Sequence, residues 1–153
     1  MFERILVPVD GSATSRKGLR EAIAVAKLSG ARVKLLHVFE PPLLGIGSEA
    51  ALMRGEDIYN IARDAGQGLL SDAAASVKAA GIPVDEQLLE AGGRRLCDQV
   101  ADTATEWRAS LIVLGSHGRR GLRRMLLGSD AEQILRTAPV PVLLVRDTEP
   151  ESA

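Results

Sequence analysis

Five short apolar runs alternate along this chain with longer segments of helical period. We interpret the apolar runs as strands, and they cover residues 3–9, 32–39, 84–90, 109–115 and 141–146. The helical segments cover residues 13–29, 56–80, 93–107 and 129–137. Parallel strands need crossover connections, which helices usually supply, so the alternation predicts one α/β domain with a five-stranded parallel sheet between two helical layers.

The connection between the fourth strand and the last helix has an unusual composition. From Gly115 to Ser129 it carries four glycines and four arginines but no acidic residue. Glycine lets a ligand approach the backbone closely or takes a positive φ, and arginine offers forked donors that match phosphate oxygens. Loops of this length are often functional when they are ordered. The run therefore predicts a cradle for an anion, most simply phosphate, and the alternative is a solvated surface loop.

The last predicted helix begins beside this loop. Ser129 and Glu132 have the spacing of a capping box, and Gly128 lacks the side chain that would block an approaching anion. Backbone N–H groups at a helix start favour negative charge. The chain contains neither GxGxxG nor a Walker sequence ending in Gly-Lys-Ser/Thr, so the cradle belongs to neither of these phosphate motifs.

The order of the strands follows from where the polar turns lie. Parallel α/β sheets bind ligands at the carboxyl ends of the strands that flank a reversal of winding. Asp10 follows the first strand and Gly115 ends the fourth, so placing these two strands side by side gives the order 3-2-1-4-5. In this order Asp10 faces Gly115 across the crevice.

The spacing of the loop is Gly115, two residues, Gly118, nine residues, and then Gly128-Ser129. This pattern resembles the ATP-binding signature of the universal stress protein family. Residues 2–12 resemble the family's opening strand and turn, and residues 138–145 resemble its closing strand. The resemblance implies a Rossmann-like domain of the adenine nucleotide alpha hydrolase type over residues 1–147, with the same strand order, and a flexible tail over residues 148–153.

The resemblance also implies that ATP, together with Mg²⁺, binds between the first and fourth strands. Pro8 and Val9 would border one side of the base and Val38 the other, while core packing is an alternative that does not exclude this role. Asp10 would bind ribose hydroxyls or share the cation, or it would serve only as a turn and cap residue. The implied nucleotide-binding residues are Pro8, Val9, Asp10, Val38, Gly115, Ser116, His117, Gly118, Arg119, Gly128 and Ser129.

Neither histidine is predicted to be catalytic. His37 lies within a strand and is expected to be packed. His117 lies in the cradle and could donate to phosphate, but Ser116 beside it has no nearby acid that would complete a nucleophilic site. Asp130 places a negative charge where many family members carry a small apolar residue. That charge favours a helix start from the solvent side, but it repels a triphosphate if it faces the crevice.

Charge and composition restrict the partners. The formal net charge is −1, which argues against a dedicated nucleic-acid binder. Cys97 is the single cysteine, so no intrachain disulfide can form. No apolar run approaches the eighteen or more residues that span a bilayer. These features lead us to expect a soluble, cytoplasmic protein with no membrane or nucleic-acid partner.

The apolar run from Val140 to Val145 would form an open edge of the sheet in the proposed order. Such an edge invites pairing with another chain, and the resembled family dimerises through this strand. We therefore expect a homodimer joined by antiparallel pairing of the fifth strands. The stretch from Glu40 to Gly55 is either a lid or a partner contact, and the sequence does not decide between them.

Three functions remain open at this point. The first is a universal stress protein that binds ATP and acts as a nucleotide-dependent regulatory dimer, with at most weak hydrolysis. The second is a slow ATPase or nucleotidyl-transfer enzyme. The third is a dimeric interaction protein that binds no nucleotide.

Overall fold

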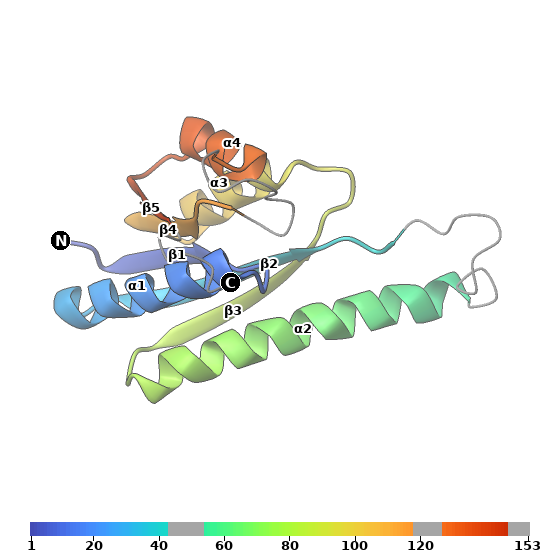
Figure 1. Ribbon diagram of the computed structural model, residues 1–153, viewed down its shortest axis with the longest axis horizontal. Helices are drawn as coiled ribbons and strands as arrows, with labels where there is room; N and C mark the ends of the chain where they lie inside the picture. Colours follow the sequence, from blue (N-terminus) through green and yellow to red (C-terminus); the bar gives the residue numbers. More distant parts are fainter. Residues whose placement is uncertain (43–53, 118–126, 147–153) are drawn as a thin grey trace, which may run out of the picture.

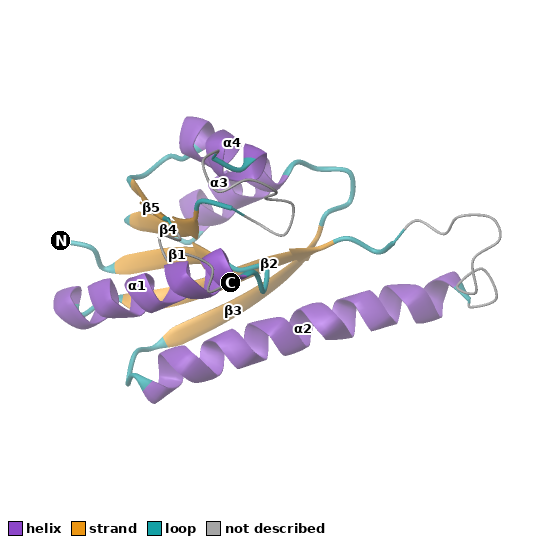
Figure 2. Ribbon diagram, in the orientation of Figure 1, coloured by secondary structure: helices purple, strands orange, loops and turns teal. Residues whose placement is uncertain are grey.

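The computed structural model describes residues 1–42, 54–117 and 127–146. Figure 1 shows a twisted sheet with helices on both sides, and Figure 2 shows the same elements by type. The strands are β1 (Arg4–Pro8), β2 (Arg32–Phe39), β3 (Val84–Glu90), β4 (Leu111–Gly115) and β5 (Val142–Val145). The helices are α1 (Ala13–Ser29), α2 (Gly55–Ala79), α3 (Leu96–Glu106) and α4 (Ser129–Thr137).

All strand pairs in this sheet are parallel, and their order is β3-β2-β1-β4-β5. The predicted fold class and strand order are therefore confirmed. β1 lies between β2 and β4, with Ile5 opposite Val33 on one side and Leu111 on the other. The carboxyl ends of β1 and β4 consequently meet at one edge of the sheet.

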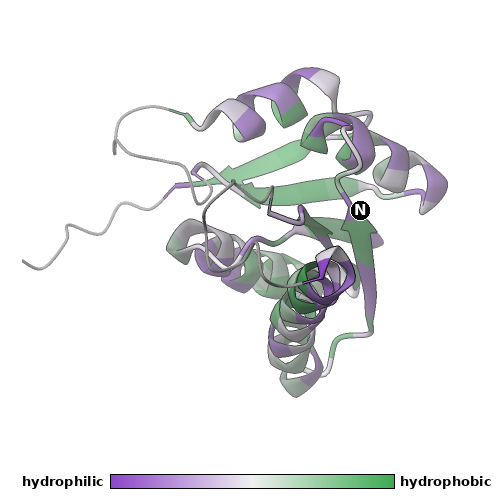
Figure 3. Ribbon diagram, turned by 90° about the vertical axis from the view of Figure 1, so that its right-hand side faces the viewer, coloured by the Kyte–Doolittle hydropathy of each residue, from purple (hydrophilic) through white to green (hydrophobic). Residues whose placement is uncertain are grey.

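Alternate residues of the central strands divide the interior into two hydrophobic layers. Ile5 and Val7 face α1 and α2, whereas Leu6 faces α3 and α4. Figure 3 shows hydrophobic strands between helices that also carry hydrophilic residues. A sheet covered on both faces needs this near-continuous apolar sequence in its central strands. Within the described ranges, no helix is both long and apolar enough to cross a bilayer.

The helix ends follow local glycine chemistry. Gly30 and Gly81 have φ values of +70° and +75°, so each supplies a left-handed residue just after a helix, α1 and α2 respectively. The prediction that the third helix begins at residue 93 was wrong, because α3 begins at Leu96. Gly92 and Gly93 both have positive φ, and this left-handed turn delays the helix by three residues.

The first turns of α1 lie directly against the end of β4. A Cβ on Gly18 would lie 3.2 Å from the backbone nitrogen of Gly115. A Cβ on Gly115 would lie 2.7 Å from both the carbonyl carbon and the carbonyl oxygen of Thr14. Two bare backbones therefore touch here, which fixes the start of α1 beside the carboxyl end of β4.

Candidate functional site

Two adjoining cavities lie at the carboxyl ends of β1, β2 and β4. The smaller has a volume of about 90 Å³, and the larger has a volume of about 830 Å³. The middle of α2 lines the larger cavity through Ala62, Ala65, Gly66 and Leu69. The amino-terminal end of this helix extends beyond the sheet (Figure 1). The residues that line both cavities are Asp10, His37, Val38, Leu96 and Asp130.

Most of the residues predicted to bind a nucleotide lie around these cavities, although they come from separate parts of the chain. Ser116 lines neither cavity and is only 1% exposed. Gly118 and Arg119 lie outside the described residues. The predicted residues that line the smaller cavity are Pro8, Val9, Asp10, Val38, Gly115 and His117. Those that line the larger cavity are Asp10, Val38, Gly128 and Ser129.

Asp10 is part of a turn and also part of the cavity walls. The backbone nitrogen of Ser12 donates to Asp10 Oδ1 at 2.8 Å, and Gly11 between them has a φ of +79°. Ser12 is the N-cap of α1, and its hydroxyl oxygen accepts from the backbone nitrogen of Ser15 at 3.1 Å. The turn role expected for Asp10 is therefore present, whereas the cap of α1 is Ser12 rather than Asp10. Because Asp10 also lines both cavities, these roles leave it facing the crevice.

Gly115 is required for packing rather than for a left-handed conformation. It is the last residue of β4, it pairs with Val145, and it is not among the glycines with positive φ. The reason for glycine at this position is the close approach of Thr14 described above. Of the two roles considered for glycine here, a positive φ is not adopted at Gly115, and its bare backbone is approached by Thr14.

The predicted capping box at Ser129 was wrong. The N-cap of α4 is Gly128, with no side-chain cap, and Ser129 is already the first helical residue. The Glu132 carboxylate instead accepts from Arg136 at 2.8 Å. Because glycine has no side-chain acceptor, the first N–H groups of α4 have no cap from their own N-cap residue. The helix start that lines the larger cavity is therefore better suited to an anion than the capping box would have made it.

Hydrogen bonds hold the segment after β4 in place. The backbone nitrogen of Ser116 donates to the Val145 carbonyl at 2.8 Å, and the Ser116 carbonyl accepts from Gly128 at 2.8 Å. The Thr14 hydroxyl donates to the His117 carbonyl at 2.6 Å. This backbone network links the end of β4 to α1, β5 and the start of α4, so the two ends of the Gly/Arg loop lie together.

His37 and Gly66 also line the larger cavity, and neither residue was predicted from the sequence to belong to the site. The packing expected for His37 is confirmed, since it is 9% exposed and its Nδ1 lies 2.7 Å from the Val9 carbonyl oxygen. A Cβ on Gly66 would lie 3.1 Å from His37 Cδ2 and 3.0 Å from Leu88 Cδ1. The signal that could have revealed this contact is a glycine in the middle of the predicted helix 56–80.

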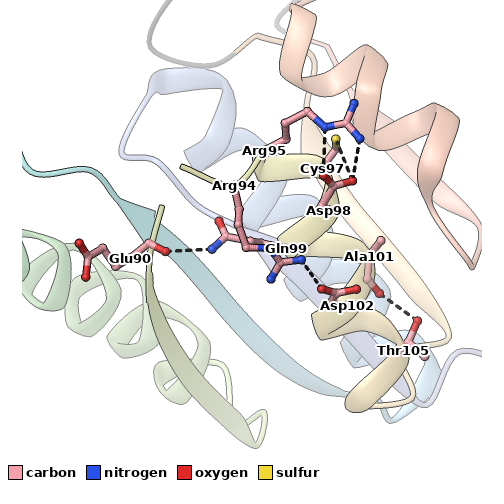
Figure 4. Close-up of polar contacts among 9 residues, drawn as sticks. All are labelled: Glu90, Arg94, Arg95, Cys97, Asp98, Gln99, Ala101, Asp102 and Thr105. Carbon is pink, nitrogen blue, oxygen red and sulfur yellow. Dashed lines mark hydrogen bonds and ion pairs between the residues drawn. The ribbon is translucent and has the colours of Figure 1, made fainter. Parts of the chain in front are cut away.

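Two further residues of the site, Arg94 and Leu96, come from the start of α3. Arg94, which precedes the N-cap of α3, lines the larger cavity, and its guanidinium forms an ion pair with Asp102 of α3 (Figure 4). The hydrogen bond to Asp102, followed by its charge, raises the pKa of Arg94 above its ordinary value. Arg94 therefore brings to the rim of the cavity a guanidinium that is paired with Asp102.

The acidic groups of the site do not form a protein-only metal centre. Within the described ranges, no group of three or more His, Cys, Asp or Glu side chains is placed to hold a metal ion. Asp10 and Asp130 nevertheless line both cavities. Mg²⁺ is usually held by one or two carboxylates together with substrate phosphates, so this pair fits a cation that arrives with a phosphorylated ligand.

Comparison with known proteins places these features in a family. The sequence model of the universal stress protein family matches residues 1–146. A universal stress protein of Methanocaldococcus jannaschii is 30% identical over 152 residues, which cover 99% of this chain and 86% of that protein.

Two solved structures with the same fold contain nucleotides. One is a universal stress protein in complex with cAMP, with 26% identity and a TM-score of 0.67, covering 95% of this chain and 97% of that one. The other is the universal stress protein from Archaeoglobus fulgidus in complex with dAMP, with 25% identity and a TM-score of 0.65. The match covers 95% of this chain and 98% of the dAMP-bound chain.

Proposed function

The chain belongs to the universal stress protein family, and we propose that it binds an adenine nucleotide, ATP, between the carboxyl ends of β1 and β4. The observation that carries this proposal is the gathering of predicted binding residues from β1, β2, β4 and α4 around two adjoining cavities. The cAMP and dAMP complexes of related proteins support an adenine nucleotide as the ligand.

The cavities have an apolar side and a polar side. Pro8, Val9 and Val38 supply apolar surface near the sheet, which suits the base. Gly128 and Ser129 supply the uncapped start of α4, which suits the phosphates. Asp10 lies on both cavities and would bind the ribose hydroxyls or a cation. We propose that Gly118 and Arg119, which lie outside the described residues, complete the phosphate site.

We propose a regulatory role for this binding rather than efficient hydrolysis. Ser116 is the hydroxyl residue beside His117, but at 1% exposure it is too deeply buried to attack a ligand. The ligand would instead contact the end of β4 and the start of α4 together, and the occupied protein would differ from the empty one in its contacts. Binding energy that favours one conformation shifts the population of conformations by the difference in affinity.

The proposal is tested by purifying the protein without added nucleotide, denaturing it and identifying any released nucleotide. ATP with Mg²⁺ is then titrated into nucleotide-free protein by calorimetry, and ADP production is followed over hours. We expect ATP to be bound and turned over slowly or not at all. Rapid turnover would establish an enzyme instead, and failure to bind any adenine nucleotide would leave the non-nucleotide interaction protein.

The same titration also tests a second prediction, which concerns the charge of Asp130. Its side chain lines both cavities, so it repels a triphosphate unless a cation lies between them. We expect Asp130→Val to raise the affinity for ATP measured without Mg²⁺ by about 5-fold to 10-fold, as befits the loss of roughly 1 kcal/mol of repulsion. The gain in affinity on adding Mg²⁺ should shrink correspondingly. Unchanged affinity under both conditions would exclude Asp130 from the site.

We also propose that the protein is a homodimer joined along β5. This strand ends the sheet, and Leu143 on it is 38% exposed. We expect a dimer mass by light scattering at micromolar concentration and a monomer mass for Leu143→Lys, because an edge lysine opposes strand pairing. Leu28→Lys is the matched control, since Leu28 is 90% exposed on α1. A monomeric wild-type protein would refute the proposal.

A further inference from the structure

The imidazole of His117 contains a polar atom that the protein itself leaves unsatisfied. Its Nε2 is buried and has no hydrogen-bond partner among the described residues. His117 lines the smaller cavity together with Gly115 and with Asp130 and Ala131 of α4. A buried polar group without a partner is costly and uncommon in folded proteins, so an unpartnered Nε2 on a residue that lines this cavity points to a partner supplied from outside the chain.

Ser116 determines which hydrogen-bonding role this atom plays. The Ser116 hydroxyl oxygen lies 2.8 Å from His117 Nδ1, and Ser116 is 1% exposed. A buried hydroxyl needs an acceptor for its proton, and Nδ1 is the acceptor within reach. If the hydroxyl donates to Nδ1, the proton of the neutral ring must reside on Nε2. The unpartnered atom is therefore a donor, Nε2–H.

We propose that His117 Nε2–H donates to a phosphate oxygen of the bound nucleotide, and that Ser116 is the positioning residue that fixes this tautomer. The inference rests on the proposed function and adds one specific contact to it. An anionic oxygen is the ligand group that satisfies a donor most strongly, and the neighbouring helix start of α4 favours the same charge. The contact thus selects for a phosphorylated ligand over a nucleoside.

Hydrogen bonds of its backbone hold Ser116 in place, so the hydroxyl can be removed without moving the rest of the residue. Its N–H and carbonyl bond to Val145 and Gly128 respectively, and alanine keeps both bonds. His37 provides an internal reference, because its Nδ1 lies 2.7 Å from a carbonyl oxygen and must donate. The two histidines of this chain are therefore expected to carry their protons on opposite nitrogens.

The tautomers are measured first, by long-range proton–nitrogen NMR of the imidazole rings in nucleotide-free protein near pH 8. We expect a protonated Nε2 for His117 and a protonated Nδ1 for His37. Addition of AMP should shift the His117 Nε2–H signal, whereas adenosine should leave it nearly unchanged. Ser116→Ala should give a mixture of tautomers at His117 and no change at His37.

Affinities for AMP and adenosine are then compared by calorimetry. We expect His117→Asn to weaken AMP binding about 10-fold or more, the loss of a charge-assisted hydrogen bond, and to change adenosine binding less than about 2-fold. His117→Gln should recover part of the loss, because its amide N–H reaches the position of Nε2. Ser116→Ala should weaken the affinity for AMP about 2-fold to 5-fold, in proportion to the decrease in the population of the Nε2–H tautomer of His117. The exposed Thr105→Ala removes a hydroxyl from α3 and should change neither affinity.

The possible outcomes distinguish a failure of this inference from a failure of the proposed function. If wild-type protein binds AMP but His117→Asn binds it equally well, or loses AMP and adenosine affinity together, the phosphate contact is refuted while nucleotide binding stands. A proton on His117 Nδ1 in wild-type protein would refute the role of Ser116. If the wild-type protein binds neither AMP nor ATP, both proposals fail.

Discussion

Gly115→Ala is expected to lower the free energy of unfolding by about 3 kcal/mol, at the upper end of the range for overpacking a well-filled interior. The new Cβ would lie 2.7 Å from the backbone of Thr14, and backbone atoms cannot move aside as a flexible side chain can. Either α1 or the end of β4 must shift. Urea denaturation followed by the fluorescence of Trp107, the single tryptophan, measures the change.

Two other glycines make this expectation specific. A Cβ on Gly18 would meet the nitrogen of Gly115 at 3.2 Å, so Gly18→Ala should cost clearly less than Gly115→Ala. Gly68 lies within α2 with nothing within 4 Å of its Cβ position, and Gly68→Ala should raise stability by about 0.5–1 kcal/mol. The expected order of stability is thus Gly68→Ala, Gly18→Ala, Gly115→Ala. Equal stabilities for the first and last variants would contradict the close contact.

The fold could be predicted almost completely, because alternation of apolar strands with helical segments is a local property of sequence. Strand order followed from one additional argument, that Asp10 and Gly115 belong on neighbouring strands, and the sheet confirms it. The errors lie at the starts of two helices, where the backbone conformation of glycine residues determines which residue begins the helix. Two successive left-handed glycines delay α3, and Gly128 rather than Ser129 occupies the N-cap position of α4, without a side-chain cap. Residue types alone do not reveal which conformation such glycines adopt.

The site was predictable where residues follow a strand end, as Asp10 and Gly115 do, because parallel strands bring their carboxyl ends together. It was less predictable where helices contribute. Arg94 and Leu96 line the larger cavity from the segment that leads into α3, and Gly66 lines it from the middle of α2, where it packs against His37 and Leu88 of the sheet. These placements depend on helix packing between segments far apart in sequence, which periodicity does not specify.

Gly128→Val is expected to lower the affinity for ATP by about 100-fold or more while leaving the fold intact. Gly128 has φ −60° and ψ 146°, a conformation that valine readily adopts, so no backbone strain arises. Its side chain would stand at the uncapped start of α4, where the phosphates are proposed to bind. Loss of two hydrogen bonds to a charged group, each worth about 1.5–3 kcal/mol, accounts for a change of this size.

The comparison that makes this result informative is Gly68→Val, which places the same side chain on the outer face of α2 with nothing within 4 Å of its Cβ position. Gly68→Val should unfold close to wild type, since valine is somewhat better than glycine within a helix. Gly128→Val should lose about 1 kcal/mol, because valine is a poorer N-cap residue than glycine. Only Gly128→Val should lose ATP in calorimetric titration. If Gly128→Val keeps ATP affinity while wild-type protein binds ATP, the phosphates do not lie at the start of α4, and the anion site must be sought beside Arg94 at the start of α3.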